Sequence, residues 1–311
     1  MRDIVVGSRN SKLALIQTKW VIEALREKGV KESFSIKEIM TKGDKNLHVS
    51  LTKLGQGGVF LQEIETQLLH GEIDFAVHSL KDVPVTVPKG LTIASIPKRE
   101  DHRDAYIAKH HIPFEKLPSG AVIGTSSIRR QAQILAKRPD LEARWIRGPI
   151  DQRIKQLEEG SFDAIILAVA GLKRLGIDLK HITEYLPEND FMPAMGQGAL
   201  AIECREDDEQ TMELLSLIHD VDTANSVYAE RLFLEAFAEG DQAPLAAYAN
   251  VKDGKVHLRG RLFSLNGKTM LEHEAIGTNP DEVAKDVATA LKQQGADALI
   301  QRTNAELKHI E

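Results

Sequence analysis

Short apolar segments alternate with amphipathic helical segments over most of this chain. The segments Ile4-Val5-Val6, 34–39 and Phe75-Ala76-Val77 are strand-like, and residues 11–28 between the first two repeat apolar side chains with a period near 3.6. This alternation is typical of βαβ units, in which helices cover the faces of a sheet. We therefore expect an α/β fold.

The predicted helix over residues 11–28 is followed by Gly29, a residue that commonly ends a helix. Its apolar side chains should form one buried stripe facing the sheet. The residues predicted for that stripe are Leu13, Ile16, Trp20, Val21, Ala24 and Leu25. A further helix is expected near residues 61–70.

A second block of alternating strands and helices runs from about residue 103 to 191. Strands are predicted near residues 105–108, 122–124, 145–146 and 165–168. Residues 200–202 then form one more apolar strand, which could return to the first sheet. Two crossings between the blocks would make a hinge.

The last part of the chain has a different pattern. A helix is expected near residues 222–237, and another near 281–294. Between them, strands are interrupted at Asp253-Gly254 and Asn266-Gly267, which are typical hairpin turns. This pattern predicts a small α+β domain. The predicted boundaries are residues 1–98 with 194–219 for domain 1, 99–193 for domain 2 and 220–311 for domain 3.

Composition limits the class of protein. The chain has 311 residues, of which 42% are hydrophobic, enough for compact domains with real cores. Acidic residues outnumber basic ones by 46 to 40 and no long basic run occurs, so a nucleic-acid partner is not expected. No apolar stretch approaches the ~20 residues of a membrane span, and the chain starts in a strand rather than a signal peptide.

Cysteine usage points to the cytoplasm. Cys204 is the single cysteine, which rules out internal disulfides and cysteine-based metal clusters. Cys204 follows the apolar segment 200–202, in a strand that should be buried, so we expect an inert core thiol. No histidines are spaced as zinc ligands, and His78 is expected to pack or cap rather than bind a metal.

Several arginines follow predicted strands. Arg129 and Arg130 stand side by side after the strand at 122–124, where a turn of small residues opens a helix. Such a turn presents backbone N–H groups to an anion, and guanidiniums add paired donors for carboxylates. Because ligands of open α/β sheets bind at the carboxyl ends of strands, these cations could converge on one polyanionic molecule, although scattered surface arginines are the alternative. Arg147, Arg153 and Arg174 occur in similar settings.

A second chemical motif follows the strand at 75–77. It reads His78-Ser79-Leu80-Lys81-Asp82-Val83-Pro84. Asp82 could stay ionised and stabilise a developing cation, while Lys81 holds a substrate carboxylate. The alternative is an Asp-initiated turn with solvated charges. The glycine run Gly55-Gln56-Gly57-Gly58 lacks the ending of a phosphate-binding P-loop and could equally be a mobile lid.

The order of these motifs resembles the hydroxymethylbilane synthase (porphobilinogen deaminase) family over nearly the whole chain. The resemblance implies three domains, of which the first two have mixed sheets folded like a type II periplasmic binding protein, with the active site in the cleft between them. The matching phrases are Gly7 to Ala14, Thr41 to Asp44, Val77 to Pro84, Arg99 to Ala105, Gly124 to Arg130, Ala164 to Gly176 and Gly196 to Ala199.

The resemblance also assigns roles to residues. It implies that four porphobilinogen units are deaminated and joined into hydroxymethylbilane, with Asp82 as the catalytic aspartate that assists loss of ammonia. Phe60 falls on an aromatic position that packs against a pyrrole ring. Positions that hold acetate and propionate groups are occupied by Arg9, Ser11, Lys53, Lys81, Ser127, Arg129, Arg130, Arg147, Arg153 and Arg174.

One departure concerns the cofactor. The family attaches a dipyrromethane primer to a cysteine in a loop of domain 3, and Asp241 stands at that position in Gly240-Asp241-Gln242. A carboxylate cannot form a stable thioether, so covalent attachment is predicted to be absent. Gly57, where a lysine is common, and Pro149, where an asparagine is common, each remove a donor.

Three functions remain open from the sequence. The first is a synthase with impaired or primer-independent turnover, and the second is a non-catalytic protein that binds pyrroles or polycarboxylates. The third, a periplasmic-type solute receptor, is disfavoured by the lack of an export signal. The expected partners are small molecules, namely porphobilinogen and linear oligopyrroles, and we expect a cytoplasmic monomer without a membrane or nucleic-acid partner.

Overall fold

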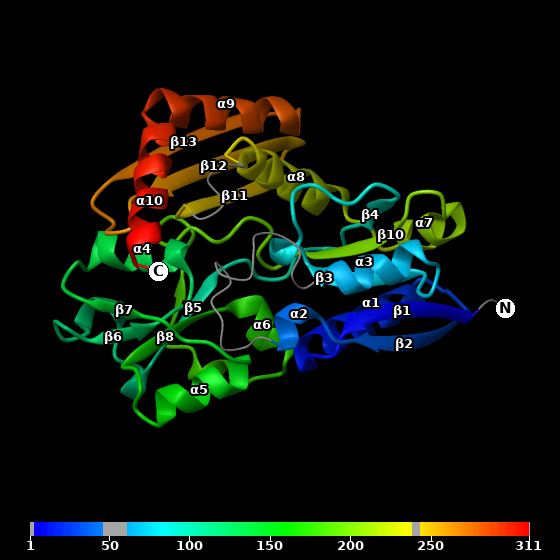
Figure 1. Cartoon of the computed structure of the whole chain (residues 1–311), viewed down its shortest axis with the longest axis horizontal. Helices are drawn as coiled ribbons and strands as arrows, with labels where there is room; N and C mark the ends of the chain where they lie inside the picture. The colour runs from blue at the N-terminus through cyan, green and yellow to red at the C-terminus, as the bar shows by residue number, and fades with distance from the viewer. Residues whose placement is uncertain (1–2, 46–60, 238–242, 311) are drawn as a thin grey trace. The chain divides into compact units, whose positions relative to one another are not determined.

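The computed structural model describes residues 3–45, 61–237 and 243–310, which form an α/β protein with three sheets (Figure 1). Two compact units are present. Residues 1–100 with 198–224 make up unit 1, and residues 101–197 with 225–311 make up unit 2. The three domain boundaries proposed from the sequence stay a prediction.

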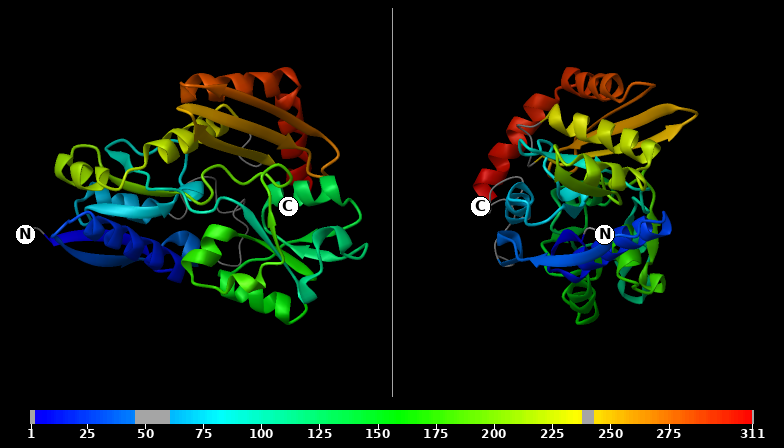
Figure 2. Two further views of the ribbon diagram at one scale, coloured as in Figure 1. Left: turned by 180° about the vertical axis from the view of Figure 1, so that it is seen from behind. Right: turned by 90° about the vertical axis from the view of Figure 1, so that its right-hand side faces the viewer.

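The sheet of unit 1 has five strands in the order β2-β1-β3-β10-β4. Strand β1 pairs in parallel with β2 and β3, whereas β10 is antiparallel to both β3 and β4. The predicted return of the later strand to the first sheet is therefore confirmed, and Figure 2 shows β10 beside β3. The strands are β1 (Asp3–Arg9), β2 (Ser33–Ile39), β3 (Phe75–Ser79), β4 (Leu91–Ser95) and β10 (Leu200–Arg205).

Helix α1 (Lys12–Glu27) packs on this sheet through a face that contains the predicted Val21 and Leu25, but it does not bury the whole predicted stripe. It begins where the Ser11 hydroxyl accepts a hydrogen bond from the Ala14 amide at 3.3 Å. The prediction for Trp20 was wrong, because its side chain is 46% exposed. The polar residues Gln17 and Thr18 are buried instead, which rotates the buried face away from Trp20. The other helices of unit 1 are α2 (Lys42–Lys45), α3 (Gln62–Leu69) and α7 (Glu209–Ser216).

Unit 2 contains a second mixed five-stranded sheet in the order β7-β6-β8-β5-β9. The strand predicted at residues 145–146 is found slightly earlier in the chain, as β7 (Glu142–Arg144). It pairs with β6 only up to Gly124 and Arg144, because the chain after Gly124 turns toward a helix. Trp145 is consequently 52% exposed. The strands are β5 (Asp104–Ala108), β6 (Val122–Gly124), β7 (Glu142–Arg144), β8 (Ala164–Ala168) and β9 (Glu184–Leu186), and the helices are α4 (Ile128–Lys137), α5 (Ile150–Glu158) and α6 (Val169–Arg174).

The third sheet is the predicted pair of hairpins, with β12 between β11 and β13. Asp253 and Gly254 both have positive φ angles, of 52° and 70°, as a two-residue hairpin turn requires. Helix α9 lies along the sheet in Figure 1, and its apolar face joins Phe233 in the core. The elements are β11 (Leu245–Lys252), β12 (Lys255–Phe263), β13 (Met270–Gly277), α8 (Val221–Glu235), α9 (Pro280–Gln293) and α10 (Ala296–Ile310). The predicted fold class, two mixed α/β sheets and a small α+β part, is thus confirmed.

Candidate functional site

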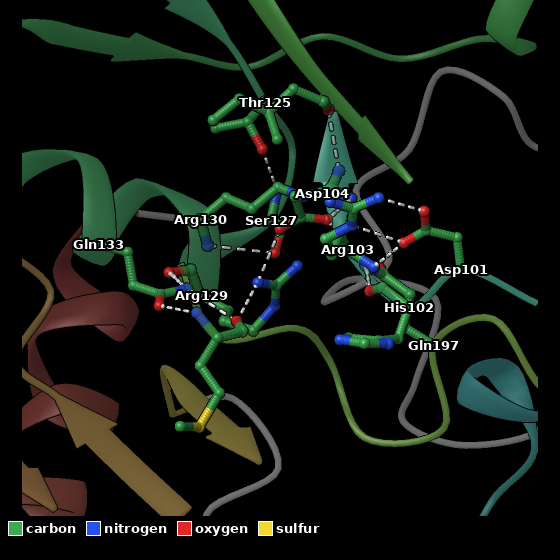
Figure 3. A network of polar contacts seen from close by, with 12 residues as sticks. Asp101, His102, Arg103, Asp104, Thr125, Ser127, Arg129, Arg130, Gln133 and Gln197 are labelled. Carbon is green, nitrogen blue, oxygen red and sulfur yellow. Dashed lines mark hydrogen bonds and ion pairs between the residues drawn. The ribbon is translucent and has the colours of Figure 1, made fainter. Parts of the chain in front are cut away.

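A buried polar network in unit 2 centres on the carboxylate of Asp104, the first residue of β5 (Figure 3). It accepts hydrogen bonds from Arg129 Nη1 at 2.9 Å, Arg130 Nη2 at 2.7 Å and Gln197 Nε2 at 2.8 Å. Burial alone would raise the pKa of Asp104, but the charges of the two arginines outweigh it and hold that pKa far below its usual value. Asp104 is therefore ionised.

The start of α4 explains why both arginines reach this carboxylate. Ser127 caps the helix by accepting a hydrogen bond from the Arg130 amide at 3.4 Å, which places Arg129 and Arg130 in the first turn. Arg129 Nη1 also donates to the Met192 carbonyl at 2.6 Å. Arg130 Nη1 donates to the Ile166 carbonyl at 2.9 Å. Both guanidiniums are consequently fixed on several sides.

Arg147 precedes α5, and Arg153 lies in its first turn. The hydrogen bonds of the two side chains differ. Arg153 Nε donates to the Gly148 carbonyl at 2.7 Å, and Arg147 Nη1 is buried without a hydrogen-bond partner. No carboxylate of the described residues forms an ion pair with either side chain. Burial lowers the pKa of Arg153, and the charges of Arg130 and Arg147 lower it further, to about 10. Burial also lowers the pKa of Arg147.

The lowered pKa values of Arg147 and Arg153 indicate that negative charge is lacking around these two cations. Three guanidiniums interact in a partly buried region where, in the described part of the chain, Asp104 is the carboxylate paired with one of them. A cation that is desolvated without a counter-ion is costly, and an anionic ligand would remove that cost. This corner of unit 2 is thus a candidate anion-binding site. Arg174, also half-buried, is the last residue of α6.

In unit 1, three of the predicted site residues line one small pocket. Arg9, Ser11 and Asp82 surround a space of about 60 Å³ together with Gln17 and Ser79. Asp82 ends the short helical turn Leu80–Asp82 that follows β3 and is exposed. Gln17 Nε2 donates to Ser79 Oγ at 2.9 Å, which fixes the wall of the pocket. Lys81 is also exposed, but it is not among the residues that line this pocket.

A buried contact between a histidine and a glutamate at this pocket was not predicted from the sequence. His78 Nε2 lies 3.1 Å from Glu203 Oε2, and both side chains are almost completely buried. His78 therefore packs inside unit 1, as the sequence suggested. Burial, and then the charge of Glu203, raises the pKa of Glu65 on α3. The one signal for Glu203 in the sequence is a carboxylate inside an otherwise apolar strand, and β10 is buried on both faces up to Cys204.

The remaining sequence assignments fall into two groups. Lys53, Gly57, Phe60 and Asp241 lie outside the described residues, so their assignments stay predictions. Cys204 is fully buried in β10, and burial raises the pKa of its thiol to about 11, so it is an inert core residue. Within the described residues, no cluster of metal-binding side chains occurs and no helix is long and apolar enough to cross a membrane.

Two family models match most of the chain. Residues 4–213 match the family model described as porphobilinogen deaminase, dipyromethane cofactor binding domain, and residues 224–293 match porphobilinogen deaminase, C-terminal domain. Among solved structures, the methionine binding protein MetQ is similar with a TM-score of 0.45 and 12% identity, over 74% of this chain and 96% of that one. Similarity at that level says nothing about the ligand.

Curated relatives match over the full length. A porphobilinogen deaminase of Oceanobacillus iheyensis is 52% identical over 99% of both chains. A porphobilinogen deaminase of a Geobacillus species is likewise 52% identical over 99% of both chains. A third, from Geobacillus kaustophilus, is 51% identical over the same shares. With two family models and these relatives in agreement, the chain belongs to the porphobilinogen deaminase family.

Proposed function

We propose that this protein is a hydroxymethylbilane synthase, which deaminates porphobilinogen and joins the pyrrole units into a linear chain. The observation that carries the proposal is the pair Arg147 and Arg153, two half-buried guanidiniums without a carboxylate partner among the described residues. Each porphobilinogen unit brings two carboxylates, so a growing chain needs many fixed cations. The charge deficit in unit 2 fits such a ligand.

The same donors fit the carboxylates of a dipyrromethane cofactor. The unpartnered Nη1 of Arg147 and the depressed pKa of Arg153 both favour a carboxylate at this position. When bound, dipyrromethane supplies the pyrrole carbon from which the product chain is extended. Our proposal keeps Ser127, Arg129, Arg130 and Arg174 as further parts of the site in unit 2.

In unit 1, we assign the catalytic role to Asp82. Loss of ammonia from porphobilinogen leaves a cationic pyrrole, and the exposed carboxylate of Asp82 beside a small polar pocket suits that charge. Arg9 and Ser11 line the same pocket and would hold a substrate carboxylate. Lys53, Phe60 and Lys81 complete the proposed binding set.

Priming is the unusual part of the proposal. Asp241 stands where the family has its attachment cysteine, and Cys204 is too deeply buried to replace it. We therefore propose that this chain carries no covalent dipyrromethane and that its turnover is impaired or depends on a non-covalent primer. The proposed setting is the cytoplasm, with a monomer acting on small molecules.

Intact mass and turnover together test the proposal. The purified chain and its Asp241→Cys variant are incubated with porphobilinogen while substrate consumption and the absorbance of oxidised product are followed. We expect the parent to show the mass of its sequence alone, with slow or no consumption, and the variant to gain the mass of two linked pyrroles and to turn over. A variant that consumes no porphobilinogen even with added primer precursor would contradict the synthase assignment.

A further inference from the structure

A histidine and a glutamate adjoin the pocket of unit 1 that contains Asp82. His78 lines this pocket, and its Nε2 lies 3.1 Å from Oε2 of Glu203, whose side chain is fully buried. We propose that Glu203 is a positioning residue that fixes the ring of His78, and that Nδ1 of His78 accepts a hydrogen bond from the aminomethyl group of the substrate. The identity of the substrate rests on the proposed function, whereas the orientation of the ring does not.

Strand register explains why the two side chains meet. In the sheet of unit 1, Glu203 on β10 lies opposite Ala76 on β3. Side chains alternate between the two faces of a strand, so Glu203, Ala76 and His78 share one face, and His78 is the diagonal neighbour of Glu203. Ala76 packs with Ile64 of α3, and this helix contacts both β3 and β10. The contact is therefore part of the sheet, and α3 covers it.

The contact gives the two ring nitrogens different roles. In a neutral imidazole one nitrogen donates and the other accepts, and a carboxylate can only accept. Nε2–H therefore donates to Glu203, and Nδ1 keeps its lone pair. Nδ1 has no hydrogen-bond partner among the described residues, yet it is not sealed from solvent. Because His78 lines the pocket, this acceptor is available to a ligand there.

Glu203 has a strong reason to hold the ring in this state. Its second oxygen, Oε1, is buried without a hydrogen-bond partner, so within the described residues the carboxylate depends on the donor from His78. A tautomer with the proton on Nδ1 would leave a buried carboxylate without any donor, which is costly. Burial, and next the charge of Glu203, raises the pKa of Glu65 on α3, which shows how strongly a further acid nearby is affected.

The pocket combines groups for both charges of a zwitterion. Arg9 and Ser11 suit a carboxylate, whereas Asp82 and Nδ1 of His78 are acceptors that suit an ammonium group. The space of about 60 Å³ is several times the roughly 15 Å³ that one water needs, so an aminomethyl group fits. Porphobilinogen carries both kinds of group. Its aminomethyl nitrogen, which leaves as ammonia, would thus be held beside the carboxylate that stabilises the remaining cation.

The first experiment reads the ring of His78 directly. Proton–nitrogen correlation spectra of isotope-labelled protein distinguish a protonated ring nitrogen from one with a lone pair. In the free parent at about pH 8 we expect a single tautomer, with Nε2 protonated and Nδ1 unprotonated. Glu203→Met removes the acceptor and should give the averaged signals of an imidazole without a fixed partner. A protonated Nδ1 in the parent, or the same single tautomer in Glu203→Met, would overturn the proposal.

The second experiment asks whether Nδ1 meets the aminomethyl group. Porphobilinogen and an analogue with a hydrogen atom in place of that group are titrated calorimetrically. His78→Gln keeps a donor for Glu203, because its amide nitrogen takes the place of Nε2, but it has no acceptor at the position of Nδ1. It should weaken porphobilinogen binding roughly tenfold or more and analogue binding less than about threefold. Equal losses for the two ligands would refute the inference.

Glu65→Gln is the matched control. Glu65 is a second acid near this pair, and within the described residues it forms no hydrogen bond to His78. The ratio of the two affinities should stay within a factor of about two of the parent ratio. Glu203→Met, in contrast, should lose affinity for porphobilinogen selectively. An equal change in both variants would mean that charge near the pocket, rather than the orientation of the ring, sets the preference.

Two results separate this inference from the proposed function. If His78→Gln is unfolded, Glu203→Met with the same two ligands decides the role of the ring. If the parent binds neither ligand, the proposed function fails, and methylammonium becomes the probe, with sodium at the same ionic strength as control. Methylammonium should then shift the Nδ1 signal of the parent more than sodium does. Equal responses to the two cations would show that Nδ1 does not receive an ammonium group, contrary to the proposal.

Discussion

Replacing Arg153 by methionine should stabilise the free protein while it abolishes tight ligand binding. The pKa of Arg153 is lowered from its usual value to about 10 by burial and by two neighbouring arginines. That depression corresponds to roughly 3 kcal/mol against the charged form. The variant also loses the hydrogen bond to the Gly148 carbonyl, worth about 1 kcal/mol. The free energy of unfolding without ligand should therefore rise by about 1–2 kcal/mol.

The free-energy cost of burying the charged Arg153 side chain depends on pH in a definite direction. Below about pH 10, Arg153 is protonated in both the folded and the unfolded chain, so its full cost is present at neutral pH. Between about pH 10 and the ordinary pKa of arginine, the folded chain has released the proton and the unfolded chain still holds it, so stability rises with pH. Arg153→Met should lack this contribution in that alkaline window.

Ligand binding should change in the opposite direction. Losing a guanidinium that contacts a desolvated carboxylate costs about 2–5 kcal/mol, or roughly 30-fold or more in affinity. Urea unfolding with and without saturating porphobilinogen, together with calorimetric titration, measures both effects on the same protein. The parent should gain stability from the ligand, and Arg153→Met should gain much less.

Arg144→Met is the matched control. Arg144 is a nearby exposed arginine whose ion pair with Glu142 is solvated on both sides. Its replacement should change the unfolding free energy by less than about 0.5 kcal/mol and leave porphobilinogen affinity unchanged. If Arg153→Met is less stable than the parent by about 1 kcal/mol without ligand, or binds porphobilinogen equally well, the charge-deficit argument is wrong.

Five further substitutions test other parts of the molecule. Asp241→Cys should acquire a covalent primer, visible as a mass gain, and in that background Asp82→Asn should lower turnover by roughly 10²-fold with little loss of porphobilinogen binding, since it removes the charge that stabilises the cation. Glu65 has a pKa raised above 4.5, so its contribution to stability is present below that pH and is lost as pH rises through the folded value; Glu65→Gln should therefore be more stable than the parent at pH 7 but not at pH 4, as urea midpoints will show. Gly267→Ala should cost about 2 kcal/mol or more, because Gly267 has a φ of 69° and an added Cβ would lie against the backbone of α4, whereas Gly295→Ala, with open space around it, should cost less in the same unfolding assay.

Local patterns predicted most of the elements because each depends on neighbouring residues. The two hairpins of the third sheet follow from turn residues at Asp253-Gly254 and Asn266-Gly267, and the strands before them need no distant partner to be recognised. The errors occur where tertiary packing decides. Trp20 has the right spacing for a buried stripe, but Gln17 is buried on α1 because it has a polar partner in Ser79, and the helix is rotated accordingly.

The candidate site was predicted only in part for the same reason. Adjacent arginines after a strand indicate anion binding, and the half-buried Arg147 and Arg153 agree with that expectation. The sequence could not show that Asp104 already neutralises part of the charge of Arg129 and Arg130, because an ion pair across 25 residues leaves no local pattern. Which arginine meets a ligand depends on such distant partners.

Strand direction explains why an acid lies among these arginines. In unit 2, β6 is parallel to β8, so the helix that follows β6 begins at the edge where β8 ends. Strand β5 is antiparallel to β8 and pairs Asp104 with Ala168, so the first residue of β5 lies at that same edge. Unit 1 repeats the arrangement, because antiparallel β10 pairs Leu200 with Ser79, just before Asp82. In a mixed sheet, the start of an antiparallel strand thus lies at the same edge as the ends of the parallel strands and adds its first residues to that edge. In unit 2 this places a carboxylate opposite the cations that a purely parallel sheet would leave unpaired.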